Sequence, residues 1–279
     1  MCFACDAYGD GGLWYLNPKN FARQLYKVKK PGEKASDYGT DPETQGGARR
    51  AQQMEVRFTD PERFQQIVKE ENIATRMGLR GIPQAIPLQD AFRVVEMAYP
   101  VAAMMCICRK TYRGTEETNI DEYSCTGLGP GMLKWERWPE RYRGGVHFMS
   151  VDEAKEWLTK WNKKGMMHSI MTFGGSYVGG ICNCDYPDCA AIRNRLDYGF
   201  EGSLLKSHYV AKVSYDKCNG CGVCVQRCQF GALKFEVTMD KANIDMFRCF
   251  GCGLCQTGCP RGAIDLIERM SIPALREVW

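Results

Sequence analysis

Cysteine is the residue type in this sequence with the greatest capacity for chemistry. The chain has 279 residues, of which 16 are cysteines and only three are histidines. Eight of the cysteines fall in two stretches that share the spacing C-x2-C-x2-C-x3-C, and both stretches continue into Gly-Ala and an apolar run. Thiolates at such short, repeated intervals are typical of metal binding rather than of core packing. The stretches are KCNGCGVCVQRCQFGALKF (Lys217–Phe235) and RCFGCGLCQTGCPRGAIDL (Arg248–Leu266).

The composition separates metal binding from the disulfide alternative. Hydrophobic residues make up 44% of the chain and charged residues 25%, as in ordinary globular proteins. The opening residues, MCFACDAYGDGG, lack the basic and apolar regions of a signal peptide, and the apolar run VAAMMCIC is too short to span a membrane. We therefore expect a cytoplasmic protein whose thiols stay reduced and bind metal. Because histidine is scarce, all-sulfur ligation of iron–sulfur clusters is favoured over mixed Cys/His zinc sites.

The repeated spacing resembles that of the bacterial-type two-cluster ferredoxins. The resemblance implies two [4Fe–4S] clusters, with the fourth cysteine of each stretch crossing over to the other cluster. Glycines between the cysteines allow backbone N–H groups to turn toward the sulfur atoms. A pair of structural zinc ribbons is the alternative. Under the resemblance, cluster A would be bound by Cys218, Cys221, Cys224 and Cys259, and cluster B by Cys249, Cys252, Cys255 and Cys228.

One position departs from the ferredoxin pattern. The family usually has proline after the fourth cysteine, and Pro260 fits, but Gln229 stands at the equivalent place in the first stretch. We expect this glutamine to change the polarity near a cluster without loss of ligation.

Short strands are predicted on both sides of each cysteine stretch. YVAKVSY and KANIDMF lead into the stretches, and ALKFEV and AIDLIE leave them. We therefore expect a ferredoxin-like domain over residues 208–270. A tail, residues 271–279, ends in Trp279, which we expect either to pack on the preceding domain or to dock a partner.

The first two thirds of the chain are predicted to be an irregular arm followed by a helical domain. Residues 1–58 are rich in turn signals, as expected for an arm that lies on a neighbouring domain or subunit. Residues 59–207 contain three helical patterns, TDPERFQQIVKEEN, PLQDAFRVVEMAYP and SVDEAKEWLTKWNKKG, the last with a Ser150–Glu153 capping box. The predicted fold class is α+β, with a mixed helical N-terminal domain that has cysteine-bearing loops, followed by the ferredoxin-like domain.

Eight further cysteines lie outside the ferredoxin pattern. Two C-x-C pairs indicate a metal site, because alternate side chains of an extended segment point the same way. One version has two further [4Fe–4S] clusters, one of them using Cys2 and Cys5, whereas a leaner version has one cluster and leaves these two unligated. A zinc site and buried free thiols are the remaining alternatives. The candidate ligands are Cys2, Cys5, Cys106, Cys108, Cys125, Cys182, Cys184 and Cys189.

Taken together, the motifs resemble those of a group of multi-cluster ferredoxin proteins of anaerobes. The shared parts are CICR (Cys106–Arg109), Cys125, ICNCDYPDC (Ile181–Cys189) and the ferredoxin cysteines, within residues 90–270. The resemblance implies electron transfer as a subunit or partner of a larger redox enzyme.

Three functions are compatible with these motifs. The first, which we expect, is an electron-transfer subunit in a hetero-oligomeric complex with a larger anaerobic oxidoreductase. The second is a redox enzyme whose upstream cluster or bound cofactor acts on a substrate, and the third is a ferredoxin with a structural zinc upstream. WERWPERYRGG (Trp135–Gly145) could line a substrate pocket or form a docking patch, and His168 is expected to be an ordinary helix-end histidine. The sequence has no P-loop, dinucleotide-binding or radical-SAM motif, and we assign no catalytic residue.

The net charge of +4 does not indicate a nucleic-acid partner. This count treats cysteines as neutral, whereas a four-thiolate [4Fe–4S] cluster carries about −2 when oxidised. Two clusters would bring the net charge to about 0, and four would bring it to about −4.

Overall fold

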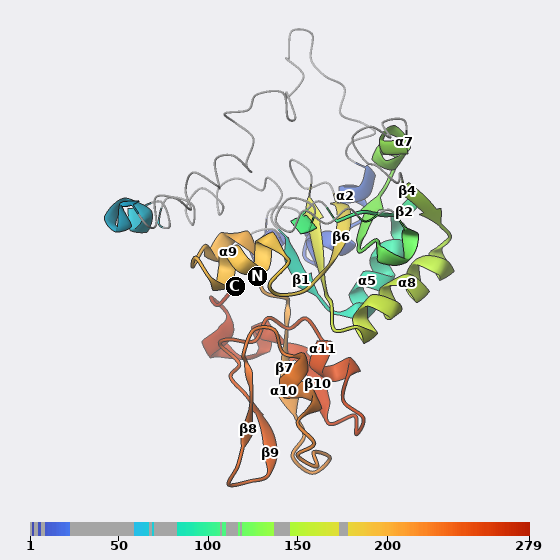
Figure 1. Ribbon diagram of the computed structural model, residues 1–279. Helices are drawn as coiled ribbons and strands as arrows, with labels where there is room; N and C mark the ends of the chain where they lie inside the picture. Colours follow the sequence, from blue (N-terminus) through green and yellow to red (C-terminus); the bar gives the residue numbers. More distant parts are fainter. Residues whose placement is uncertain are drawn as a thin grey trace.

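The computed structural model shows a chain in two parts, one above the other in Figure 1. The first strand of the second part begins at Tyr209, and we call the boundary between the two parts the seam. The first part contains a six-stranded sheet, and the second is built on two two-stranded sheets. The predicted helix positions Ile67 and Val68, most of the predicted arm (23–58) and residues 137–145 lie outside the described residues. The structure describes residues 2, 5–6, 9–22, 59–66, 69, 83–106, 108–109, 117, 119–136, 146–172 and 178–279.

Each strand of the six-stranded sheet is antiparallel to its neighbours, in the order β1-β5-β6-β3-β2-β4. The α+β fold class is confirmed, but the sequence predicts helices and loops here and no sheet. Strands β1, β2 and β6 are buried along nearly their whole length, so no polar–apolar alternation marks them as strands. The strands are β1 (Gln84–Ile86), β2 (Val101–Met104), β3 (Cys125–Leu128), β4 (Val146–Met149), β5 (Met167–Thr172) and β6 (Val178–Cys184).

Two amphipathic helices, α5 (Leu88–Met97) and α8 (Val151–Lys163), pack together and against the sheet. Both fall within segments that the sequence predicts to be helical. The capping box of α8 is confirmed, because the Ser150 hydroxyl accepts from the Glu153 N–H and the Glu153 carboxylate accepts from the Ser150 N–H at 2.8 Å. The buried face of α8 carries Ala154, Trp157, Leu158 and Trp161.

The described N-terminal residues lie on the core of their own chain. Trp14 Nε1 donates to Gln84 Oε1 of β1 at 2.7 Å, and the Tyr15 hydroxyl donates to the Asp90 carboxylate of α5 at 2.8 Å. Both aromatic side chains are buried. This segment of the predicted arm is therefore a layer of the first part rather than an extension from it; it contains the 3-10 helix η1 (Trp14–Leu16) and α2 (Lys19–Ala22).

His168 differs from its prediction as a helix-end histidine. It lies in the middle of the sheet, in β5, and it is fully buried. Its ring bonds to Asn183 Oδ1 at 2.7 Å and to Asn162 Nδ2 at 3.2 Å. Burial lowers the pKa of His168 to about 4, so the ring is neutral and has a structural role. The remaining short elements of the first part are η2 (Ile120–Glu122), α7 (Gly131–Glu136), α9 (Ala190–Leu196) and η3 (Glu201–Ser203).

The second part contains the four strands that the sequence predicts on either side of the cysteine stretches. β7 (Tyr209–Val213) pairs with β10 (Ile264–Glu268), and β8 (Leu233–Glu236) pairs with β9 (Lys241–Ile244), both antiparallel. No helix among the described residues is long and apolar enough to cross a membrane. The helical elements are α10 (Val223–Arg227), α11 (Leu254–Thr257), η4 (Arg269–Ser271) and η5 (Pro273–Leu275).

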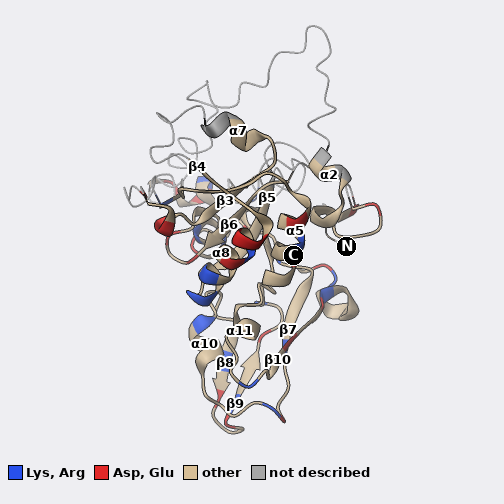
Figure 2. Cartoon of the chain, turned by 90° about the vertical axis from the view of Figure 1, so that its right-hand side faces the viewer, with Lys and Arg blue, Asp and Glu red and all other residues tan. Residues whose placement is uncertain are grey.

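Arg227 of α10 fastens the second part to the first. Its guanidinium donates to the carbonyl oxygens of Asn162 and Lys163, at 2.7 and 3.2 Å, which lie at the C-terminal end of α8. The same group donates to the Leu254 carbonyl at 2.9 Å. Figure 2 shows basic residues at the end of α8, in the first part, and in α10, in the second part. A cation at the C-terminal end of a helix also complements the helix dipole.

Candidate metal centres

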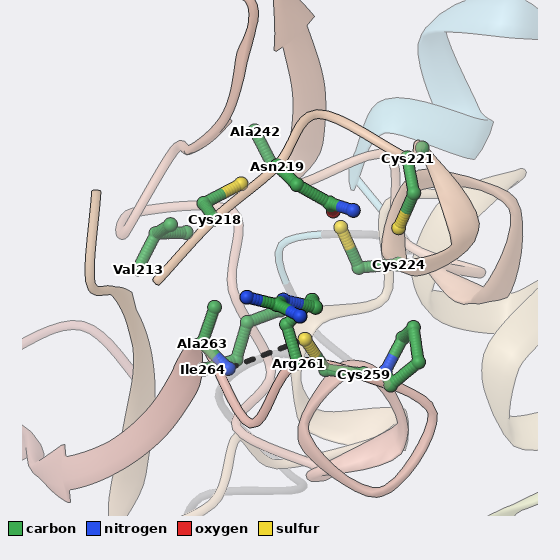
Figure 3. Close-up of a pocket in the computed structure, with 12 residues that line it drawn as sticks. Val213, Cys218, Asn219, Cys221, Cys224, Ala242, Cys259, Arg261, Ala263 and Ile264 are labelled. Carbon is green, nitrogen blue, oxygen red and sulfur yellow. Dashed lines mark hydrogen bonds between the residues drawn. The ribbon is translucent and has the colours of Figure 1, made fainter. Parts of the chain in front are cut away.

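The first group of four cysteines surrounds a small cavity in the second part. Sulfur atoms from the loop before α10, from α10 itself and from the loop after α11 face one another, as Figure 3 shows. The cavity measures about 10 Å³, and the Ala263 N–H donates to Cys259 Sγ at 3.3 Å. The lining cysteines, Cys218, Cys221, Cys224 and Cys259, are the four that the crossed pattern assigns to cluster A.

The second group surrounds a cavity of about 20 Å³ that lies nearer the seam. The N–H groups of Ala211 and Gly251 donate to Cys249 Sγ at 3.5 and 3.4 Å. Backbone donors of this kind stabilise thiolates and the negative charge of a cluster. The lining cysteines, Cys228, Cys249, Cys252 and Cys255, are those assigned to cluster B. Both groups therefore have the four thiols that a [4Fe–4S] cluster uses, in the crossed arrangement of two-cluster ferredoxins.

Two glycines show why the loops around these cavities need residues without a side chain. Gly251 has a φ of +66°, and a Cβ atom there would lie 2.0 Å from the Tyr209 carbonyl oxygen. Gly220 has a φ of +72°, and its Cβ would lie 2.5 Å from the Asp240 carbonyl oxygen. Both loops therefore run directly against backbone, at a conformation that other residues seldom adopt.

Burial disfavours negative charge at the second cavity. Burial raises the pKa of Cys249, and it raises the pKa of Cys252 to about 12. The positive charge of bound iron would therefore have to stabilise the thiolates that ligate a cluster here. One protein cation lies close by: Arg269 is fully buried and donates to the Cys249 carbonyl at 2.8 Å. Burial lowers the pKa of Arg269 to about 10, which leaves it charged at neutral pH.

We expect Arg269→Gln to lower the reduction potential of the cluster at Cys249 by on the order of 50 mV, because a nearby positive charge favours the reduced, more negative cluster. Arg248→Gln removes the same charge from an exposed position in the same domain and serves as the control. Redox titration followed by electron paramagnetic resonance measures both shifts. Equal potentials in the two variants would contradict an effect of the buried charge.

The upstream cysteines also converge, at the end of the six-stranded sheet. Cys125 of β3 pairs directly with Cys182 of β6, and Met104, two residues before Cys106, pairs with Cys125. Cys182 and Cys184 occupy alternate positions of β6, as the C-x-C pattern predicts. A cavity of about 50 Å³, larger than either ferredoxin cavity, is lined by Cys106, Cys108, Cys125, Cys182, Cys184 and Cys189.

These six thiols lie in a row, in which each member affects the pKa of the next. The order is Cys108, Cys106, Cys125, Cys182, Cys184 and Cys189. Hydrogen bonds from Cys125 and Cys184 lower the pKa of Cys182 to about 6, whereas the pKa of Cys125 is raised. Six adjacent thiolates would repel one another strongly, so the row is suited to a bound cation or cluster that neutralises several of them.

Arg109 joins the loops that carry these cysteines. Its guanidinium contacts Glu117 at 3.1 Å, Asp185 at 3.0 Å and Asp188 at 3.5 Å, and it donates to the Ser124 hydroxyl at 2.8 Å. Glu117 in turn accepts from the N–H of Cys106 at 2.8 Å. The arginine of the CICR motif, to which the sequence assigns no role, therefore orients three separate cysteine-bearing segments.

The upstream cavity and the second ferredoxin cavity both border one apolar cluster at the seam. Phe230 and Phe250 stack at its centre, with ring centroids 4.0 Å apart. We call this group the seam cluster; its cysteines are Cys182, Cys184 and Cys189 from the first part and Cys228 and Cys252 from the second.

Gln229, the departure from the ferredoxin pattern, connects the second ferredoxin cavity with the upstream cysteines. Its side-chain oxygen accepts from the Tyr186 N–H at 2.9 Å, and its Nε2 donates to the carbonyls of Gly165 at 2.7 Å and Cys184 at 3.4 Å. A proline in this position could make none of these bonds. The amide therefore attaches the residue after Cys228 to the loop between Cys184 and Cys189.

Cys2 and Cys5 lie in the main core of the first part, away from the row of six thiols. Both are 1% exposed, and their nearest polar neighbour is the ring of His208. The sequence analysis names the two cysteines but not His208, because nothing in the local pattern around a histidine 203 residues away points to them.

A comparison with protein-family models supports the assignment of the second part. The model of the 4Fe-4S dicluster domain matches residues 209–263. No curated protein matches the chain. The matched residues include the eight cysteines around the two ferredoxin cavities. The second part is therefore a 4Fe–4S dicluster domain of the ferredoxin type, which supports an iron–sulfur electron-transfer role for the chain.

Proposed function

We propose that this chain is an electron-transfer subunit that relays electrons through the two clusters of the dicluster domain and one further [4Fe–4S] cluster in the upstream cavity. The observation that carries the proposal is the seam cluster, in which cysteines of the upstream row pack together with Cys228 and Cys252. Each cluster would accept and return one electron at a time. Electron tunnelling depends steeply on distance, so sites that share one apolar wall are well placed for exchange.

The arrangement favours the leaner version, with a single upstream cluster. Six cysteines line one cavity, whereas Cys2 and Cys5 lie with His208. A cluster needs four ligands, and the row offers six, so two thiols would stay near the cluster without binding it.

The geometry supports an order of transfer from cluster A to cluster B and then to the upstream site. Cys221 is exposed, so the first cavity is the one nearest the surface. The turn between β8 and β9 lies beside this loop, since Asp240 abuts Gly220, and it exposes Val237 by 81% and Met239 by 51%. We propose that a larger anaerobic oxidoreductase docks here, because an apolar rim next to an exposed ligand suits a redox partner.

Metal analysis tests the proposal. The anaerobically purified chain should contain about twelve irons, and Cys184→Ser should reduce this to about eight without a change in the signals of the dicluster domain. Because the row has two more thiols than a cluster needs, spare thiols can replace Cys184; the triple variant Cys182→Ser, Cys184→Ser, Cys189→Ser leaves three of the six cysteines and should show the loss. Cys5→Ser, which lies outside the row, is the control and should keep twelve irons.

About eight irons in the unaltered chain, together with zinc that is lost in Cys184→Ser, would replace this proposal with a structural zinc in the upstream cavity. Twelve irons that survive both serine variants would show that the additional cluster lies elsewhere.

A further inference from the structure

We infer that Cys2, Cys5 and His208 bind a single zinc ion that holds the N-terminal segment against the start of the dicluster domain. Their three ligand atoms all lie within 4.8 Å of one another. His208 Nε2 lies 3.2 Å from Cys5 Sγ and 3.6 Å from Cys2 Sγ. Tetrahedral zinc, with bonds of about 2.3 Å to sulfur and about 2.0 Å to nitrogen, separates a sulfur from a nitrogen ligand by about 3.5 Å.

The number of thiols argues against an iron–sulfur cluster at this place. A [4Fe–4S] cluster is usually bound by four cysteine thiolates, whereas the described residues bring two cysteines and one histidine together here. Two thiolates and one imidazole are a typical zinc ligand set. Two thiolates also neutralise Zn²⁺, so the burial of both cysteines at 1% exposure would not leave a net charge in the core.

Hydrogen bonds orient both cysteines toward the histidine. The Trp14 N–H donates to Cys5 Sγ at 3.4 Å, and Gln84 Nε2 approaches Cys2 Sγ at 3.8 Å. Gln84 is itself fixed, because its oxygen accepts from Trp14 Nε1 at 2.7 Å and its nitrogen donates to the Lys206 carbonyl at 3.0 Å. Outer groups that orient ligands in this way are a general feature of metal sites.

The position of the histidine indicates what the ion would stabilise. His208 directly precedes β7, at the seam, and the Trp279 ring lies 5.1 Å from its ring. Figures 1 and 2 both show the two chain ends close together there. An ion bound to Cys2 and Cys5 would thus tie the N-terminal segment, the start of the dicluster domain and the C-terminal tail together. The described residues supply three ligands, and a fourth, such as water, completes the tetrahedron.

Zinc content measured together with iron content tests this site. The anaerobically purified full chain should contain about one zinc, and X-ray absorption at the zinc edge should show two sulfur ligands with nitrogen or oxygen completing the shell. Cys5→Ser and His208→Ala should lose the zinc and keep the iron. His147→Ala, at an exposed position in β4, is the matched control and should keep both.

Three outcomes would overturn the inference: a chain without zinc whose Cys2 and Cys5 form a disulfide, zinc with four sulfur ligands, or zinc that survives both variants. The iron content reports whether the His208→Ala variant folds. If that variant does not fold, the zinc-edge X-ray absorption of the unaltered chain still tests the site. Cys184→Ser should keep this zinc, so failure of the zinc site and failure of the proposed upstream cluster can be told apart.

Discussion

Gly251→Ala should abolish the cluster at Cys249 and destabilise the dicluster domain by about 3 kcal/mol or more. Two costs combine. A non-glycine residue at a φ of +66° costs about 1–2 kcal/mol, and the new Cβ would lie 2.0 Å from the Tyr209 carbonyl oxygen. That oxygen belongs to a backbone held in the β7–β10 ladder, so it cannot move aside without disturbing the N–H groups that donate to Cys249.

Gly262→Ala is the matched control for this variant. Gly262 also has a positive φ, +56°, but nothing lies within 4 Å of its expected Cβ, so only the backbone cost of about 1–2 kcal/mol applies. Anaerobic denaturant unfolding and iron and sulfide content compare the two. If both variants lost the same stability and kept both clusters, the contact with Tyr209 would not be the constraint.

Arg109→Gln should remove the metal of the upstream site while the irons of the dicluster domain remain. The variant leaves three carboxylates without their cation, and Glu117 is only 7% exposed. Breaking a buried ion network by removing one partner costs about 3–5 kcal/mol, an upper range here because Asp185 and Asp188 are partly exposed. The three carboxylates, no longer neutralised by Arg109, should repel one another, and the cysteine-bearing loops attached to them should separate too.

Arg193→Gln provides the comparison. Arg193 pairs with Asp197 at 3.2 Å in α9, close to the same loops, but both side chains are partly exposed and the pair should contribute less than about 1 kcal/mol. Iron and zinc analysis should show full metal content in Arg193→Gln and a loss confined to the upstream site in Arg109→Gln. Full metal in both variants would show that the cysteine loops hold their arrangement without the arginine.

The dicluster domain could be predicted from the sequence because its information is local. The eight cysteines fall within 42 residues, and the four predicted strands lie directly before or after the two stretches in the sequence. Even the grouping of Cys259 with Cys218, Cys221 and Cys224 around one cavity agrees with the expected crossed pattern. The ligand assignments themselves stay predictions until the metal is measured.

The upstream site could be predicted only in part. Counting cysteines identifies the six thiols, and the alternation in β6 explains why Cys182 and Cys184 point the same way. The sheet that joins Cys125 to Cys182 was not recognisable, because its buried strands lack alternation. Arg109 and Gln229 act through contacts up to 76 residues away in the sequence, and no local pattern encodes those partners.

The contact between Cys2 and His208 also has a consequence for the order in which this protein folds. The two residues are 206 positions apart, and Trp14 reaches Gln84 across 70. Chains usually begin to fold from the N-terminus during synthesis. Here Cys2 and Cys5 cannot reach their final place until His208, more than 200 residues later, has left the ribosome, so two thiols that become buried stay exposed until then. Contacts this distant slow folding, and we expect docking of the N-terminal segment to be its last step.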